Sequence, residues 1–432
     1  MAEIKSFRAW RYNRSLSSSI ETLTSPLFDV VSEKQRITLY KNPLNSIHLS
    51  VPLDPEPAQR AAETLKQWKE SRILVQDVLP GIYVYYQYFT LPGSVKEYCR
   101  KGFITHIRAY DWEERVILRH ENTIPKAVND RTELLEKTML HTSATHGLYT
   151  DPTRELETYM DDAITHPIYI TEDYQGVRDV LAVIQDAHVI KKFIDSLAEK
   201  NIILADGHHR YESSLALKHK LAKKESGGKE GFNFHLMFLS NTESDDLRIL
   251  PTHRLMQGLP DFSEEKVLRK LAPYFTIKPI DEADTLYEII LGKPWTFGLV
   301  FKENSYKVRL LPDAFLDFHW PFPDEIKKLD LTVMHYFIIE KALGIPGKDQ
   351  RESDHIGFDR SVADCIAKVG RDEAQMAIIT QDVAMSDVKR VCLSGYTMPQ
   401  KSTYFYPKII CGFLFSSIRE NEFYTPPYSP FA

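Results

Sequence analysis

The sequence has little of what marks a secreted, membrane-spanning or disulfide-stabilised protein. Its 432 residues include only 4 cysteines, and no two of them form a CxxC pair. Such scattered cysteines are typical of buried thiols in a reducing compartment. No run of about 18 apolar residues is present, so no membrane-spanning helix is expected. The first residues also lack the apolar stretch of a signal peptide. These absences predict a cytoplasmic protein with no membrane partner.

Several well-known catalytic motifs are missing as well. The sequence contains no GxSxG, GxGxxG or P-loop GxxxxGK[ST] pattern and no set of SxxK, SDN and KTG motifs, so serine hydrolase, Rossmann dehydrogenase and β-lactamase functions have no motif in their favour. The segment HENT at 120–123 lacks the HExxH spacing of a zinc protease. The net charge of −6 argues against broad binding of nucleic-acid phosphates, which needs a concentrated basic surface. We therefore expect no nucleic-acid partner.

The composition is that of an ordinary globular protein, with 43% hydrophobic and 26% charged residues. A chain of this length predicts roughly two or three domains. We divide it into an N-terminal part, 1–150, a core unit, 151–260, and a C-terminal part, 261–432. Helical and strand patterns alternate along all three parts. They predict an α/β (α+β) protein with mixed sheets.

Hydrophobic periodicity and turn residues locate the main elements. Ser32 is expected to cap a short helix, and Asp130 with Glu133 resembles a capping box at the start of another. The segment 397–418 is read as a turn that leads into a strand. Further predicted elements are helices at 56–72, 130–142, 188–200 and 328–345, and strands at 46–53, 81–90 and 232–240.

Residues 201–240 form the clearest unit in the sequence. An apolar strand, IILA, leads into a turn at Asp206–Arg210, and a helix is expected to follow through about Lys223. The segment SGGKEG at 226–231 is predicted to be a flexible tip before the next strand. The order is therefore strand, tight turn, helix, loop, strand.

The turn Asp206-Gly207-His208-His209-Arg210 concentrates chemically useful groups at one strand-to-helix junction. Gly207 permits a left-handed turn, and the helix that follows directs backbone N–H groups and its positive end toward the turn. Arg210 can grip a phosphate or carboxylate, the histidines can donate hydrogen bonds, and Asp206 can bind Mg²⁺ or accept a proton. A surface turn with a capping aspartate and solvated histidines is the alternative. Zinc is disfavoured, because adjacent histidines point in different directions and no spaced ligand set accompanies them.

Other polar segments could contribute to the same site. Lys401, Ser402 and Thr403, together with Lys408, lie ahead of an apolar strand and could cradle an anion, although an ordinary basic loop would look the same. We predict that Lys401, Ser402 or Lys408 approaches the Asp206–Arg210 turn, because one cation is rarely enough for a polyphosphate. Two further segments, Ser25–Asp29 and 120–123, each carry one acid and could otherwise be simple polar turns.

A set of short motifs resembles a known family of uncharacterised bacterial and archaeal proteins, domain of unknown function 1015. The motifs occur in the order expected for that family and extend over nearly the whole chain. The family name states no function. The motifs are RAWRYN, SPLFDVVS, NPLNSIHL, HENT, ADGHHRYESSLA, ILPTHRL, LDLTVMH and MPQKSTYFYPK.

The DGHHR element also resembles, more distantly, the phosphate-binding element of the ParB/sulfiredoxin-like fold, which includes free L-serine kinases. This resemblance implies a nucleotide-binding core, with Mg²⁺ held by Asp206. A catalytic acid would come from the N-terminal part, either Asp29 or Glu121. Sulfiredoxin chemistry requires a cysteine where this chain has His208, so that activity is not implied. The implied nucleotide ligands are Gly207, His208, His209, Arg210, Lys401, Ser402, Thr403 and Lys408.

Together, these patterns predict a nucleotide-dependent phosphotransferase. Its expected cofactors are a nucleoside di- or triphosphate and Mg²⁺, and its expected substrate is a small hydroxylated metabolite, for which serine is the best single candidate. The catalytic residues would be Asp29, Glu121 and Asp206. Two alternatives use the same anion site: a nucleotide- or metabolite-binding regulator without turnover, and a phosphohydrolase.

Overall fold

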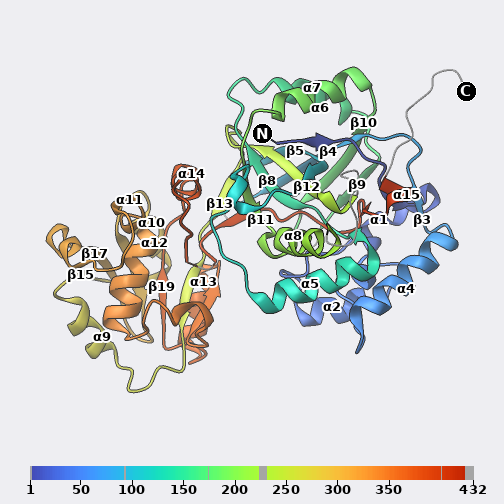
Figure 1. Cartoon of the computed structure of the whole chain (residues 1–432). Helices are drawn as coiled ribbons and strands as arrows, with labels where there is room; N and C mark the ends of the chain where they lie inside the picture. Colours follow the sequence, from blue (N-terminus) through green and yellow to red (C-terminus); the bar gives the residue numbers. More distant parts are fainter. Residues whose placement is uncertain (1, 92–93, 174, 223–230, 400, 424–432) are drawn as a thin grey trace, which may run out of the picture. The chain divides into compact units, whose positions relative to one another are not determined.

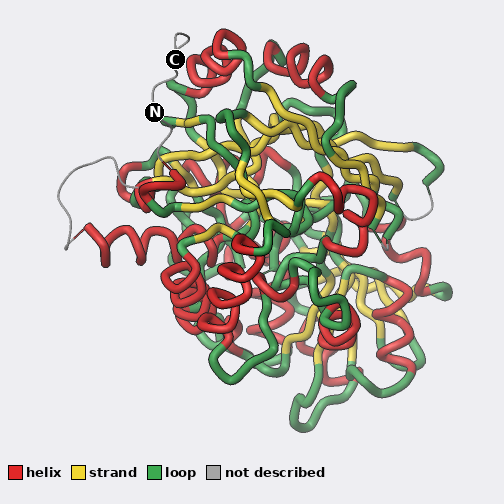
Figure 2. The backbone as a smooth tube through the Cα atoms, turned by 90° about the vertical axis from the view of Figure 1, so that its right-hand side faces the viewer, coloured by secondary structure: helices red, strands yellow, loops and turns green. Residues whose placement is uncertain are grey.

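The computed structural model describes residues 2–91, 94–173, 175–222, 231–399 and 401–423 (Figure 1). The chain divides into two compact units: unit 1 comprises Met1–Leu247 with Pro407–Ala432, and unit 2 comprises Arg248–Tyr406. Helices flank strands in both (Figure 2), which confirms the α/β class with mixed sheets. The sequence-based division at 150 and 260 uses different boundaries and stays a prediction.

Unit 1 is organised around a mixed sheet with nine strands among the described residues. Its path is β6-β11-β8-β12-β5-β4-β10-β9, and β1 pairs with β5 off this path. The pairs β11–β6 and β12–β8 are parallel, while the other neighbours run antiparallel. The strands are β1 (Ile4–Lys5), β4 (Ile82–Thr90), β5 (Glu97–Arg108), β6 (Ile117–Leu118), β8 (Thr145–Tyr149), β9 (Tyr169–Glu172), β10 (Arg178–Ile184), β11 (Ile202–Asp206) and β12 (Phe234–Asn241).

The helices of unit 1 begin where the sequence supplies suitable first residues. Ser32 and Gln35 form a capping box on α2, as the sequence predicts for Ser32, and Asp186 accepts hydrogen bonds from the first amides of α7. Helices α6 and α7 lie together along one side of the sheet, and α5 packs against both α8 and α4 (Figure 1). The helices are α1 (Ile20–Leu23), α2 (Glu33–Leu39), α3 (Ile47–Ser50), α4 (Pro57–Glu70), α5 (Pro125–Thr138), α6 (Glu155–Ala163), α7 (Ala187–Leu197), α8 (His208–Ala222) and α15 (Glu420–Phe423).

Two predicted elements of unit 1 differ from the structure. Helix α5 starts at Pro125 rather than after Asp130, because proline fits the first helical position, where no amide donor is needed. The predicted strand at 46–53 is a short helix, α3. The side chain of Asn45 accepts a hydrogen bond from the Ile47 amide at 2.9 Å, which favours a helical start over an extended chain.

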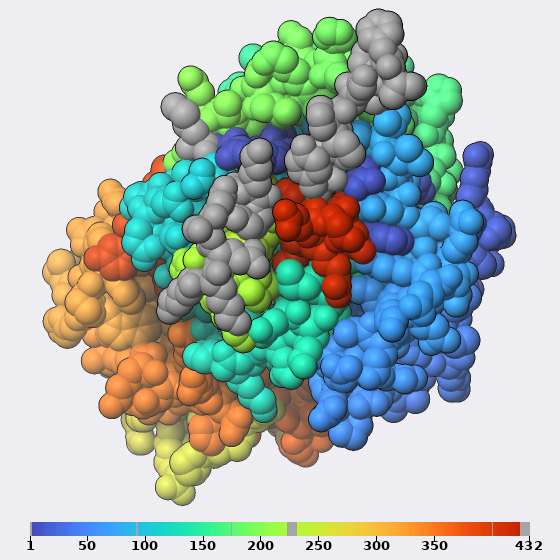
Figure 3. All heavy atoms as spheres, turned by 45° about the vertical axis from the view of Figure 1, so that its right-hand side comes forward, coloured from blue at the N-terminus to red at the C-terminus, as the bar shows by residue number. Residues whose placement is uncertain are grey.

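The C-terminal segment of unit 1, from Pro407 to Phe423, runs among elements from the beginning of the chain. Phe415 pairs with Trp10 through two backbone hydrogen bonds of 2.8 and 2.9 Å. Trp10 itself belongs to β2 (Trp10–Tyr12), which pairs with β3 (Leu74–Gln76), and β21 (Ser416–Ser417) pairs with β7 (Leu140–His141). Figure 3 shows the end of this segment, in red, between N-terminal residues in blue and α5 in teal.

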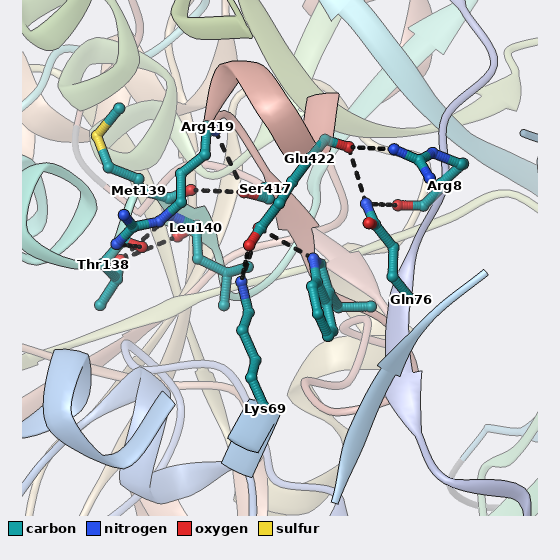
Figure 4. A network of polar contacts seen from close by, with 10 residues as sticks. Arg8, Lys69, Gln76, Thr138, Met139, Leu140, Ser417, Arg419 and Glu422 are labelled. Carbon is teal, nitrogen blue, oxygen red and sulfur yellow. Dashed lines mark hydrogen bonds and ion pairs between the residues drawn. The ribbon is translucent and has the colours of Figure 1, made fainter. Parts of the chain in front are cut away.

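A polar network fastens the end of this segment (Figure 4). The Glu422 carboxylate accepts hydrogen bonds from Lys69 Nζ at 2.7 and 2.8 Å and from Trp10 Nε1 at 3.1 Å, and its carbonyl oxygen accepts one from Gln76 at 2.8 Å. Burial lowers the pKa of Lys69, although the charge of Glu422 opposes this shift. The network anchors the segment that also carries Lys408.

Unit 2 contains a six-stranded sheet in its described part, in the order β15-β17-β16-β19-β14-β18, and a separate β13–β20 pair. The predicted helix at 328–345 is α12 followed by a π-helical segment, Met334–Ala342. This segment has more residues per turn than the α-helix that the sequence pattern indicates. The elements are β13 (Arg248–Leu250), β14 (His253–Met256), β15 (Phe275–Ile280), β16 (Thr296–Val300), β17 (Ser305–Leu310), β18 (Ile356–Asp359), β19 (Met376–Ile379), β20 (Tyr404–Tyr406), α9 (Glu264–Leu271), α10 (Leu286–Ile290), α11 (Asp324–Lys327), α12 (Asp330–Val333), α13 (Val362–Gly370) and α14 (Met385–Ser394).

Within the described ranges, no helix combines the length and the apolar character that crossing a membrane requires.

Candidate functional site

The strand-to-helix junction at Asp206 is tighter than the sequence suggests. Strand β11 ends at Asp206 and α8 begins at His208, so Gly207 alone makes the turn. Gly207 has φ of +87°, in the left-handed region. A Cβ atom at this position would lie 2.7 Å from Thr145 Cγ2 and 2.8 Å from Arg210 Nη2. The predicted order of strand, turn, helix and second strand is confirmed, but the turn is Gly207 alone, because His208, His209 and Arg210 already belong to α8. Lys223 and residues 226–230 lie outside the described residues.

Replacing Gly207 by alanine should therefore destabilise unit 1 and displace Arg210. We expect a loss of about 1–3 kcal/mol in the free energy of unfolding, from backbone strain and the close contacts together. Gly176→Ala is the matched control, because Gly176 also has a positive φ, +77°, but a Cβ atom there would meet no described atom within 4 Å. Denaturant titration of both variants measures the difference. Equal losses would mean that the contacts at Gly207 are unimportant.

Asp206 binds two cations inside unit 1. Its Oδ2 lies 3.0 Å from Arg210 Nη2, and its Oδ1 contacts Lys408 Nζ. The side chains of Asp206, Arg210 and Lys408 are only 11%, 9% and 14% exposed. Burial alone would raise the pKa of Asp206, but the charges of Lys408 and Arg210 outweigh it and hold that pKa below its usual range. Asp206 is therefore ionised at neutral pH and orients both cations.

Arg210 is also held from its other side. Its Nη1 donates to Ser143 Oγ at 3.0 Å and contacts the Ala144 carbonyl oxygen, both in the segment that leads into β8. Its Nε is buried and makes no hydrogen bond within the part of the chain that the structure describes. The guanidinium is thus fixed in position while one donor remains unsatisfied.

The histidines of this junction have different roles. The His208 ring is buried and packs edge-on against His120, with ring centroids 4.9 Å apart. Burial lowers the pKa of His208 well below its usual value and lowers that of His120 to about 4, so both rings are neutral at pH 7. His209 instead accepts a hydrogen bond at Nε2 from the Ile124 amide at 3.0 Å, and thereby fixes the start of α5.

A row of buried polar side chains, absent from the sequence-based site, lies on neighbouring strands. Gln87 on β4 faces Asp179 on β10 and Arg100 on β5, and it donates to Asp179 Oδ1 at 2.8 Å. Arg100 contacts Gln87 Oε1 and is 1% exposed. Burial raises the pKa of Asp179 to about 7, although hydrogen bonds from Tyr85 and Gln87 favour the charged form. A glutamine within the apolar run 81–90 is the one sequence signal that could have indicated this row.

The row is linked to the Asp206 cluster through Lys408. Gln87 Nε2 donates to the Lys408 carbonyl oxygen at 3.0 Å, while the Lys408 ammonium contacts Asp206. His146, which is one of the neighbours that lower the Asp206 pKa, lies 2.7 Å from the Ser240 hydroxyl. Burial lowers the pKa of His146, and the charge of Arg100 lowers it further. Together, these contacts place positive charge from three chain segments in one buried region.

The remaining residues of the sequence-based site are the two acids, Asp29 and Glu121, and the polar segment 401–403. Asp29 acts electrostatically on the thiol of Cys411, whose backbone pairs with Ser25, so the N-terminal turn and the C-terminal segment meet. Glu121 follows His120 in the half-buried segment before α5. Their roles stay predictions. Lys401, Ser402 and Thr403 belong to unit 2, where the Ser402 hydroxyl donates to the Pro399 carbonyl, and their roles as nucleotide ligands also stay predictions.

The residues around Asp206 do not fit a bound metal ion. Both carboxylate oxygens contact cations, which a metal would have to displace. In the ranges that the structure covers, no group of three or more His, Cys, Asp and Glu side chains is arranged to hold a metal. Mg²⁺ therefore takes no part in the chemistry that we derive from this geometry.

The chain is similar in structure to several solved proteins. A free serine kinase mutant in complex with AMP is 12% identical, with a TM-score of 0.37 over 74% of this chain and 94% of that one. A conserved hypothetical protein from Pyrococcus furiosus is 11% identical, with a TM-score of 0.35 over 74% of this chain and 97% of that one. SbnI from Staphylococcus aureus, with a C-terminal truncation, is 12% identical, with a TM-score of 0.35 over 71% and 85%.

No curated protein sequence matches the chain. A family model does: the one described as "Protein of unknown function (DUF1015)" matches residues 4–332, well over half of the sequence. The motifs from RAWRYN to ILPTHRL all fall within this range and agree with the match. The chain therefore belongs to the DUF1015 family.

Proposed function

We propose that unit 1 binds the phosphate groups of a nucleotide beside Asp206 and transfers a phosphoryl group to a small hydroxylated metabolite. The observation that carries the proposal is the pair of buried cations at the turn. Arg210 and Lys408 both contact the Asp206 carboxylate, and their side chains are only 9% and 14% exposed. A guanidinium and an ammonium group that are held side by side in this way are groups that bind phosphate oxygens.

The backbone supports the same proposal. Helix α8 begins directly after the turn made by Gly207, and a helix N-terminus favours an anion through its N–H groups and the positive end of its dipole. The DGHHR element resembles that of free L-serine kinases, and solved complexes of free serine kinase contain AMP or ADP. A nucleoside di- or triphosphate is the proposed donor, and serine is the first acceptor to test.

The reaction requires positioning and charge neutralisation more than covalent chemistry. An acceptor hydroxyl oxygen attacks the terminal phosphorus, the bond from phosphorus to the nucleotide oxygen breaks, and the hydroxyl proton passes to a carboxylate. Lys408 and Arg210 stabilise the charge on the phosphate oxygens. Asp206 acts as a positioning residue for both cations. Asp29 is the proposed proton acceptor, and Glu121 is the second candidate.

The direct experiment combines a nucleotide screen with a transfer assay. A ligand at about 100 times its dissociation constant should stabilise the protein by about 2.7 kcal/mol, which thermal unfolding detects. Labelled ATP and ADP are then incubated with serine and other hydroxylated acceptors. A labelled acceptor supports the proposal. Binding without transfer would indicate a regulatory protein, and release of inorganic phosphate alone would indicate a phosphohydrolase.

The assignment of the proton acceptor gives a separate prediction. Asp29→Asn should lower the rate of phosphoryl transfer by about 10²–10⁴-fold while nucleotide affinity stays unchanged, because a general base acts on the acceptor rather than on the donor. Glu121→Gln is the matched comparison, with both variants assayed for transfer and for ADP binding. If Glu121→Gln loses transfer activity and Asp29→Asn does not, the proton acceptor is Glu121. If neither variant loses activity, neither residue is the base.

A further inference from the structure

A small pocket with both apolar and polar lining residues lies in unit 1, and it shares Arg210 with the Asp206 cluster. Two arginines line it, Arg131 from α5 and Arg210 from α8, together with hydroxyl groups that include those of Ser50 and Ser143. Phe28 and Cys411 contribute to its wall. None of the described side chains that line it is acidic. Two guanidinium groups with hydroxyls and no carboxylate form a lining suited to an anion.

Arg131 is held in place at the wall of this pocket by contacts with its neighbours. Its Nη1 donates to the Ser50 carbonyl oxygen at 2.7 Å, and its Nε and Nη2 donate to Asp130 Oδ2 at 2.8 and 2.6 Å. The guanidinium lies over the Phe28 ring, 4.6 Å from its centroid, and the side chain is only 11% exposed. These contacts leave the arginine preorganised, so little rotamer entropy is lost when a ligand binds.

Two buried polar atoms at the pocket have no hydrogen-bond partner within the described ranges. One is the Nε–H of Arg210, whose side chain is 9% exposed, and the other is the hydroxyl of Ser50, which is 3% exposed. Buried donors are normally satisfied, so each such atom calls for an explanation. The two atoms come from separate chain segments, and both residues line the same pocket, which is why we look for a ligand there.

We propose that this pocket binds one oxyanion group, a carboxylate or a phosphate, of a small ligand between Arg131 and Arg210. Arg210 also contacts Asp206, so a ligand anchored here lies beside the proposed phosphate site. Resting on the proposed function, the ligand is the acceptor itself, held by its carboxylate. The acceptor class is then the small hydroxylated carboxylic acids.

Calorimetric titration of the full chain with glycerate and, separately, with inorganic phosphate tests this site. Arg131→Gln should lower the affinity for the preferred anion by about 10- to 150-fold, which is the effect of losing a charge-assisted hydrogen bond. Arg60→Gln is the matched control, since Arg60 lies on α4 with its side chain 56% exposed. Tighter binding of glycerate identifies a carboxylate pocket, and tighter binding of phosphate identifies a phosphate pocket. Absence of saturable binding of either anion overturns the proposal.

Ser50→Ala separates binding from folding. The hydroxyl has no hydrogen-bond partner among the described residues, so its removal should leave the melting temperature unchanged or slightly raised. The same change should lower the affinity for the anion by about 3- to 10-fold. A fall in melting temperature with unchanged affinity overturns the role given to Ser50 and, with it, the pocket. ADP titration distinguishes the two proposals: glycerate binding without ADP binding leaves this site standing and defeats the nucleotide site, and the reverse result does the opposite.

Discussion

Replacing Arg210 by alanine is expected to weaken ADP binding by about 10- to 150-fold. The guanidinium supplies a charge-assisted hydrogen bond to a phosphate already charged before reaction, and losing such a bond costs about 1.5–3 kcal/mol. The same variant should also bind anions more weakly in the pocket between Arg131 and Arg210, because Arg210 lines that pocket. Calorimetric titration with ADP measures the effect, and Arg60→Ala is the control on an exposed position.

The Arg210→Ala variant should also be less stable. Breaking a buried ion pair by removing one partner costs about 3–5 kcal/mol, and the lower end applies here because Lys408 still contacts Asp206. The Ala144 carbonyl and the Ser143 hydroxyl lose a donor as well. Denaturant titration gives the stability loss, and binding is then measured where the variant is folded. Wild-type ADP affinity in a folded Arg210→Ala protein would defeat the phosphate-site assignment.

Acid is expected to destabilise unit 1 strongly at pH values where most proteins remain folded. Burial lowers the pKa of a group of histidines below the usual value of 6.5, to about 4 for two of them, His120 and His141. The unfolded chain takes up protons near pH 6.5 while the folded rings stay neutral, so falling pH favours unfolding. The other histidines of this group are His106, His146, His208 and His235.

As the pH falls from 6.5 to the folded-state pKa of such a histidine, that histidine should lower the free energy of unfolding by about 1.4 kcal/mol per pH unit. Asp179 acts in the opposite direction, because its pKa of about 7 means that the folded protein gains a proton as the pH falls toward 3.8. Glu157 and Asp173, whose pKa values burial also raises, act in the same direction as Asp179, but the six buried histidines outnumber these three carboxyl groups. Urea titrations at half-unit steps from pH 7.5 to 4.5 should show a steadily falling free energy of unfolding. A constant value from pH 7 to pH 5 would contradict the buried, neutral state of these rings.

The sequence predicts the local elements well where short-range chemistry determines them. The apolar run before Asp206, Gly207 and the following helical stripe give the order β11, turn, α8, β12 correctly. The capping residue Ser32 gives α2. Where two local signals compete, the prediction fails: Pro125 initiates α5 ahead of the capping box expected at Asp130.

The partners within the site depend on contacts between distant residues, and the sequence indicates only some of them. Lys408 was among the residues expected to approach the turn, and its contact with Asp206 confirms this over 202 positions. The pairing of Gln87 with Asp179 and Arg100 depends on strand register, which a single sequence does not specify. The role of His209 in holding the Ile124 amide is equally non-local, because the two residues meet only when α8 packs on α5.

Equilibrium binding of ADP to the Lys408→Met protein is the most direct test of the phosphate site. Methionine keeps most of the aliphatic chain, removes the cation that contacts Asp206, and leaves the carbonyl that Gln87 binds. Lys220→Met is the matched control, since Lys220 lies on α8 with its side chain 51% exposed. We predict saturable ADP binding for wild type and the control, and affinity at least about 10-fold weaker for Lys408→Met with its fold intact. Equal affinity in all three proteins, or no ADP binding by wild type, would contradict the account.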